Sequence, residues 1–229
     1  MTVCVYSYTI YHSPNAYLGT VLLRRALADM PWVELVRRPI YIPRERGLMV
    51  AELLGGRENS NAGSYNREDC RRWSERFAIP MSYPDPSVFH ERAQRWALSP
   101  LDREELPARA FYAADPGKRD LLDQALFEAA WVEGIDVNES ATIGWAAQRA
   151  GLDPARLLAA AGDPAPAEAA RAALAEFERN QCPGVPTVII YRERYVNRSR
   201  TIYPQRFFGK DRVDWVVDLC RAAGHQTVS

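Results

Sequence analysis

Short stretches of β-type sequence at both ends of the chain enclose a long helical middle, and this arrangement limits the possible folds most. Residues 3–10, VCVYSYTI, are rich in β-branched and aromatic types and predict a buried strand. Ser13 and Pro14 then open a helical segment, because serine favours the N-cap and proline the first helical position. Residues 32–42 predict a second strand. Such a β-α-β opening predicts two parallel strands joined by a right-handed crossover.

The middle of the chain carries helical patterns. Residues 43–64 are polar and rich in glycine and asparagine, with a short helix expected at 47–54. From Tyr65 onward apolar positions recur at helical spacing, and proline or glycine separates the segments. We expect helices over residues 66–78, 86–98, 117–134, 139–150, 153–162 and 164–180.

The sequence returns to β type after residue 182. A loop containing Val185 and Pro186 leads into an apolar run that predicts a third strand. Residues 192–206 are polar and contain five arginines. We expect a solvated hairpin there, with a dimer arm or an acid-binding lid as alternatives. Residues 206–209 predict a short strand, and residues 210–224 predict a final amphipathic helix.

Together the two ends predict an α/β, thioredoxin-like fold (β-α-β … β-β-α) that carries a large all-helical insertion. We expect the thioredoxin-like domain over residues 1–64 and 181–229, and the helical insertion domain over residues 65–180.

Composition excludes several classes of function. Lysine plus arginine and aspartate plus glutamate both number 29 in the 229 residues, so the net charge of zero gives no signal for nucleic acid. No apolar run approaches the length of a membrane span, and the N-terminal residues do not resemble a signal peptide. We therefore expect a cytoplasmic protein without a nucleic-acid or membrane partner.

The cysteines exclude two further classes. Cys4, Cys70, Cys182 and Cys220 form no C-x-x-C pair and match no zinc spacing. We expect each to be a free, buried or half-buried thiol. The sequence therefore predicts neither a metal site nor a dithiol redox enzyme.

The turn after the first strand is the place where chemistry is most expected. A helix N-terminus presents unpaired N–H groups and the positive end of the helix dipole, so it stabilises an anion such as a thiolate. Ser13 stands at this turn. Its hydroxyl cannot exchange disulfides, but it can donate a hydrogen bond to a thiolate that another molecule supplies. The alternative is that Ser13 only caps the helix. His12 beside it is a possible proton donor, although a packed or exposed histidine is the more common case.

Two further features could bind a ligand. If the bond between Val185 and Pro186 is cis, the backbone of Val185 is placed to pair with an extended peptide. Lys210 and Asp211 stand at the start of the last helix, where a carboxylate could cap the helix or hold the α-amino and α-carboxylate groups of a ligand.

Five motifs in order resemble one known family. They are SPNAYL after the first strand, YNREDCRRWSERFAIP from residue 65, FxxAWVEGxDV over 127–137, GVPT before the third strand, and FFGKDRVDWV before the last helix. This set is similar to the 2-hydroxychromene-2-carboxylate isomerase and kappa-class glutathione transferase family, which has the DsbA-like thioredoxin fold.

The resemblance implies roles for single residues. Ser13 would stabilise the thiolate of bound glutathione. Val185, before a cis-Pro186, would pair its backbone with the cysteinyl unit of glutathione, and Lys210 and Asp211 would hold the γ-glutamyl end. Relatives are commonly dimers, so a homodimer is expected.

The sequence departs from the family pattern in the loop before Tyr65. Either Asn59 or Asn61 stands for the family's ligand-binding asparagine, while the prolines and the lysine of that loop are missing. This leaves open how the glycyl end of glutathione and the substrate would be held.

Three functions follow from the resemblance. The first is a glutathione-dependent isomerase that acts on a small unsaturated, aromatic carboxylic acid, with Ser13 as the catalytic residue. The second is a kappa-like glutathione transferase or peroxidase. The third is a non-catalytic DsbA-like binding module, which the altered loop and the long 192–206 segment favour.

Overall fold

The computed structural model describes residues 2–44, 61–196 and 199–225. The chain divides into two compact units. The sheet unit comprises Met1–Arg38 and Ala175–Ser229, and the helical unit comprises Pro39–Leu174. These divisions fall after Arg38 and Leu174, whereas the sequence places the domain boundaries at 64/65 and 180/181. The helix expected at 47–54 lies outside the described residues.

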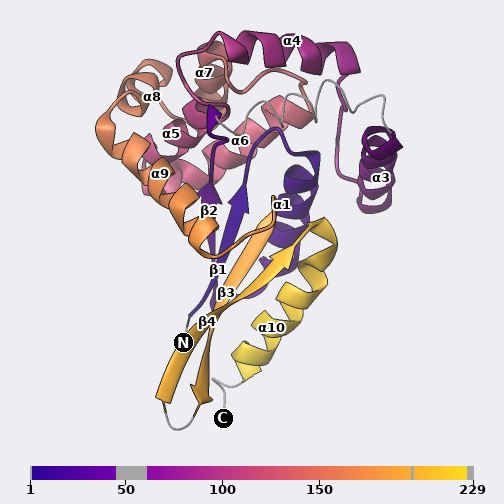
Figure 1. Ribbon diagram of the computed structural model, residues 1–229, viewed down its shortest axis with the longest axis vertical. Helices are drawn as coiled ribbons and strands as arrows, with labels where there is room; N and C mark the ends of the chain where they lie inside the picture. Colours follow the sequence, from indigo (N-terminus) through magenta and orange to yellow (C-terminus); the bar gives the residue numbers. More distant parts are fainter. Residues whose placement is uncertain (1, 45–60, 197–198, 226–229) are drawn as a thin grey trace. The chain divides into compact units, whose positions relative to one another are not determined.

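A four-stranded sheet forms the centre of the sheet unit (Figure 1). The strands β1 (Val3–Thr9), β2 (Val33–Pro39), β3 (Thr187–Val196) and β4 (Ser199–Phe208) lie in the order β2-β1-β3-β4. The pairs β1–β3 and β3–β4 are antiparallel. Because the sheet is mixed, β1 and β2 are the parallel pair, as the β-α-β opening predicts. The thioredoxin-like fold is therefore confirmed.

The last two strands correct one expectation. Of the predicted strand 206–209, the first three residues are only the end of β4, and Gly209 follows it. β4 runs for ten residues and pairs with β3 from Thr187 opposite Phe208 to Val196 opposite Ser199. The arginines conceal this strand, because the backbone pairing of a hairpin does not require apolar side chains on both faces. The expected hairpin over 192–206 is confirmed.

Two helices supply the apolar core beside this sheet. These are α1 (Pro14–Leu27) and α10 (Val213–His225), the latter preceded by the 3-10 helix η3 (Lys210–Arg212). Side chains one turn apart on each helix meet alternate side chains of β1 and β3. The buried members of this core are Val5, Leu23, Leu27, Met30, Val188, Ile190, Val216, Val217 and Cys220.

Apart from α1 and α10, the described α-helices are those that the sequence predicts, together with one that it does not. They are α3 (Asn61–Phe77), α4 (Pro86–Ala97), α5 (Glu105–Ala113), α6 (Arg119–Trp131), α7 (Ser140–Arg149), α8 (Pro154–Ala161) and α9 (Pro164–Arg179). These helices belong to the helical unit, except that α9 continues past Leu174 into the sheet unit. α3 starts at Asn61, five residues before the predicted start, and α5 is unpredicted.

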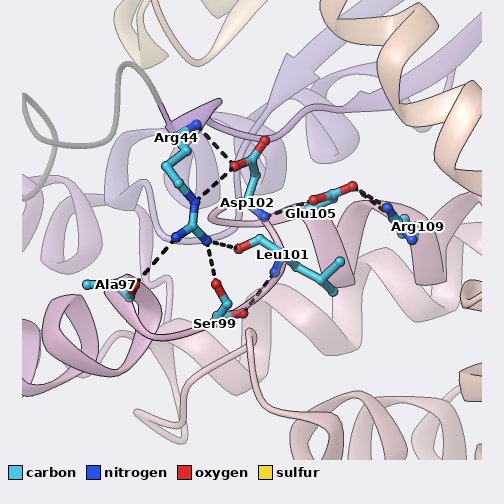
Figure 2. Close-up of polar contacts among 7 residues, drawn as sticks. All are labelled: Arg44, Ala97, Ser99, Leu101, Asp102, Glu105 and Arg109. Carbon is cyan, nitrogen blue, oxygen red and sulfur yellow. Dashed lines mark hydrogen bonds and ion pairs between the residues drawn. The ribbon is translucent and has the colours of Figure 1, made fainter.

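The start of α5 depends on residues far away in the sequence, as Figure 2 shows. The N–H of Asp102 donates to Oε2 of Glu105 at 2.8 Å, and Glu104 between them has a left-handed φ of 67°. Nε of Arg44 lies 3.8 Å from Oδ1 of Asp102. The Arg44 guanidinium also donates to the carbonyls of Ala97, Ser99 and Leu101. These contacts position the loop that enters α5. Because they come from distant residues, the local sequence does not mark the start of this helix.

Candidate functional site

Ser13 caps α1 at the turn that follows β1. Its backbone is extended, with φ −93° and ψ 114°, and its Oγ accepts a hydrogen bond from the N–H of Ala16 at 3.1 Å. Pro14 is the first helical residue, which needs no N–H partner. A capping hydroxyl of this kind still has its own proton to donate. Ser13 is half-buried, so this proton can be offered to a ligand.

The first turn of α1 is electropositive. The first turn contains no acidic side chain that would offset the positive end of the dipole. Lys210 adds a charge, because its Nζ donates to Oδ1 of Asn15 at 2.6 Å. The Lys210 side chain is buried, so solvent screens its charge only weakly. An anion beside Ser13 would be stabilised by the Ser13 hydroxyl, the positive end of the helix dipole and this ammonium together.

Three segments of the sheet unit pack closely at this place. A Cβ at Gly19 of α1 would lie 3.2 Å from Cγ of Pro186 and 3.4 Å from Cα of Lys210. The N–H of Gly209 donates to the carbonyl of Pro186 at 3.0 Å. The bond between Val185 and Pro186 is cis. The structure therefore brings the start of α1, the loop at Pro186 and the start of η3 to one site.

The residues predicted for ligand binding differ in their surroundings. Val185 is half-buried and precedes Thr187, where the ladder with β4 begins. Lys210 lies inward against Asn15, whereas the carboxylate of Asp211 is exposed and lies 2.7 Å from the guanidinium of Arg212. Only Asp211 of this pair presents its charge outward.

The structure describes one of the two candidate asparagines. Asn61 is the first residue of α3, in the helical unit. Asn59 lies outside the described residues.

Sequence reasoning missed two residues that build this site. Asn15 receives the Lys210 hydrogen bond, and nothing local marks it because Lys210 lies 195 residues later. Gly19 permits the close approach of Pro186, and its signal is visible as a single glycine within an apolar helical pattern.

Burial disfavours the thiolate form of three of the four cysteines. All four cysteines are free. Burial raises the pKa of Cys182 and of Cys220 to about 11, and burial is also the main cause that raises the pKa of Cys4. The thiolate is the reactive form, so these environments suppress redox chemistry rather than promote it. His12 is buried beside Ser13, with only 4% of its surface exposed.

Metal-type clusters and membrane-length apolar helices are both absent from the described residues. Within residues 2–44, 61–196 and 199–225 no group of three or more His, Cys, Asp or Glu side chains is arranged to hold a metal ion. None of the helices in these ranges combines the length and the apolar character that crossing a bilayer requires.

Solved structures resemble this chain over almost its full length. The 2-hydroxychromene-2-carboxylate isomerase structure has a TM-score of 0.70 at 17% identity and covers 98% of both chains. A probable DsbA oxidoreductase from Streptomyces coelicolor has a TM-score of 0.70 at 17% identity, covering 97% of this chain and 90% of its own. The cytosolic disulfide reductase DsbM from Pseudomonas aeruginosa, solved with GSH, has a TM-score of 0.59 at 15% identity, covering 98% of both chains. At these identities the likeness shows the fold.

The family assignment comes from the sequence itself. No curated protein matches the chain significantly. The profile of the DSBA-like thioredoxin domain matches residues 5–220, which span both the sheet unit and the helical unit. The chain therefore belongs to the DSBA-like thioredoxin domain family.

Proposed function

We propose that this protein is a glutathione-dependent isomerase of a small unsaturated, aromatic carboxylic acid, and that Ser13 stabilises the thiolate of the cofactor. The observation that carries the proposal is the electropositive first turn of α1, which is capped by the half-buried hydroxyl of Ser13. The solved complex of a family neighbour with GSH supports the choice of thiol.

The donor set at this turn suits a sulfur anion. The Ser13 hydroxyl can donate one hydrogen bond, and the positive end of the α1 dipole lies at the same turn. Hydrogen bonds to the charged form of a group lower its pKa. Ser13 would therefore keep a thiol ionised near neutral pH without being consumed.

The neighbouring residues would position the cofactor. Val185 offers backbone groups outside the β3–β4 ladder, and Asp211 offers an exposed carboxylate to an ammonium group. Lys210 would act indirectly: its ammonium group holds the Asn15 side chain by a hydrogen bond and adds positive charge to the first turn of α1. Asn59 or Asn61 remains our candidate for the glycyl end.

The isomerisation itself needs no redox partner. When bound, glutathione supplies a thiol nucleophile that adds reversibly to an electron-poor carbon–carbon double bond and leaves unchanged once the bond has rotated. Ser13 would stabilise the departing sulfur by donating a hydrogen bond to it as negative charge develops there again.

Calorimetric titration with reduced glutathione tests the binding half of the proposal. We expect saturable binding, a lowered pKa of the bound thiol measured by thiolate absorbance, and a rise of that pKa by about one unit in Ser13→Ala. Asp153→Ala is the matched control, because Asp153 caps α8 through the N–H of Arg156 at 2.9 Å and its loss costs comparable helix stability. No binding at millimolar glutathione would overturn the proposal.

The fate of the thiol separates the candidate activities. With cis-cinnamate as the probe, an isomerase converts the acid while the total free thiol stays constant. A transferase, our second candidate because the same first turn of α1 would serve it, lowers the free thiol as conjugate accumulates. Binding without either change would leave only the non-catalytic module.

We further propose that the protein acts as a homodimer. Ile202 and Phe208 are exposed apolar side chains on β4, which is an edge strand of the sheet, and Trp215 on α10 is 64% exposed. Light scattering should then give twice the 25.9 kDa of the chain. A mass of one chain at micromolar concentration would refute this.

A further inference from the structure

The helical unit contains a small pocket that the thiol site does not use. Its volume is about 220 Å³, and it is lined by Arg67, Arg71, Ser74, Met81 and Tyr83. All of these residues belong to the helical unit, so the pocket is complete within one compact part of the chain.

The spacing of the lining residues explains how the pocket forms. Arg67, Arg71 and Ser74 follow one another at intervals of four and three residues, so they share one face of α3. The N–H of Ile79 donates to the Ser74 carbonyl at 3.0 Å, and Ser74 Oγ donates to the Ile79 carbonyl at 2.7 Å. These two bonds close the end of α3 and position the segment that follows, in which Met81 and Tyr83 occur.

Tyr83 is held in place as one wall. Its hydroxyl accepts a hydrogen bond from Nδ2 of Asn66 at 3.2 Å, and its ring centroid lies 5.5 Å from that of Trp131. Cζ of Arg67 lies 5.3 Å from the centre of the Tyr83 ring, within the range of a cation–π contact. The guanidinium of Arg67 is thus oriented by an aromatic face.

A carboxylate lies near each of the two arginines. Glu75 lies 3.5 Å from Arg71, but both side chains are about two-thirds exposed, where ion pairs contribute little. Asp85 is near Arg67, but its carboxylate accepts from the N–H and Oγ of Ser87 at the start of α4. An incoming anion can therefore compete with Glu75 for the guanidinium of Arg71.

We propose that this pocket binds a small carboxylic acid with a flat apolar body. The carboxylate would lie on Arg67 and Arg71, since a guanidinium matches a carboxylate with two parallel hydrogen bonds. The body would pack on Met81 and Tyr83. A volume of about 220 Å³ is below the range for drug-sized ligands, which favours an acid with a single ring. This site does not depend on the proposed thiol chemistry.

Benzoate is the probe for this site, and benzamide is its neutral counterpart of almost the same shape. Calorimetry of the full chain should show saturable benzoate binding, with benzamide at least about tenfold weaker because it lacks the charge. In NMR spectra, benzoate should change the amide chemical shifts of residues in α3 and of residues near Tyr83. Inorganic phosphate, which has charge and no apolar body, should bind more weakly than benzoate.

Arginine variants decide whether the named residues carry the binding. We expect Arg67→Gln and Arg71→Gln each to weaken benzoate binding by about tenfold. Arg76→Gln is the matched control, because it removes the same charge from an exposed position of α3 outside the pocket. Thermal unfolding of each variant checks that the fold is retained.

Three results would overturn the proposal. Equal affinity for benzamide and benzoate would show an apolar cavity without acid recognition. An equal loss in Arg76→Gln and Arg67→Gln would show only general attraction of anions. Absence of saturable binding would show that the pocket takes no such acid. Unaltered glutathione binding in Arg67→Gln keeps this test separate from the thiol site.

Discussion

Replacing Gly19 by alanine tests how closely α1 must approach the loops of the site. Alanine in a helix interior is favoured over glycine by about 1 kcal/mol. A Cβ at Gly19, however, would lie 3.2 Å from Cγ of Pro186 and 3.4 Å from Cα and Cβ of Lys210. Contacts this short require the neighbours to move, and overpacking costs about 1–3 kcal/mol. We expect Gly19→Ala to lower the free energy of unfolding by roughly 1 kcal/mol net.

The matched control is Gly144→Ala in α7. A Cβ at Gly144 would lie 3.6 Å from Cβ of Pro154, which is an ordinary contact. This variant should therefore gain up to about 1 kcal/mol from helix propensity alone. Urea unfolding, followed by circular dichroism, measures both changes. If Gly19→Ala stabilised the protein as much as Gly144→Ala does, Pro186 and Lys210 would not be held firmly against α1, and the reasoning about the site would fail.

Three other predictions concern the sheet unit. Gly209→Ala should lower the free energy of unfolding by about 1–3 kcal/mol, because Gly209 has a φ of 102° and a Cβ there would lie 2.5 Å from Oδ1 of Asp211; an unchanged urea midpoint would contradict this. Lys210→Met should cost about 1 kcal/mol through loss of the hydrogen bond to Asn15, and a gain in urea stability would show that burying the ammonium costs more. Burial raises the pKa of Cys220 to about 11 from 9.0, so the unfolded thiol loses its proton first and stability falls as the pH rises from 9 to 11. Cys220→Ala should reduce this fall, and an identical pH dependence of the unfolding free energy in both proteins would refute the assignment.

The sequence alone determined the features that depend on neighbouring residues. Ser13 before Pro14 and Asp153 before Pro154 mark helix starts, and both helices begin where these pairs place them. Capping needs only a side-chain oxygen and an N–H two or three residues later, so the local sequence is enough to predict it. The order of strands and helices follows from the same local patterns, and with it the thioredoxin-like fold.

Features that depend on distant partners escaped the sequence. The start of α5 rests on Arg44, which reaches carbonyl groups more than fifty residues away. The length of β4 is set by its backbone pairing with β3, and the polar side chains of this segment give no strand pattern that would reveal it.

The candidate site divides in the same way. Ser13 could be predicted, because its position after a strand and before a proline is a local pattern. The inward position of Lys210 could not, because its partner Asn15 lies 195 residues earlier. The pocket on α3 lies between these cases: the spacing of Arg67 and Arg71 is visible in the sequence, but only the folded chain pairs Arg67 with the ring of Tyr83. Local chemistry therefore determined which groups are available, and tertiary packing decided which of them meet, because hydrogen bonds and ring contacts act only over a few ångströms.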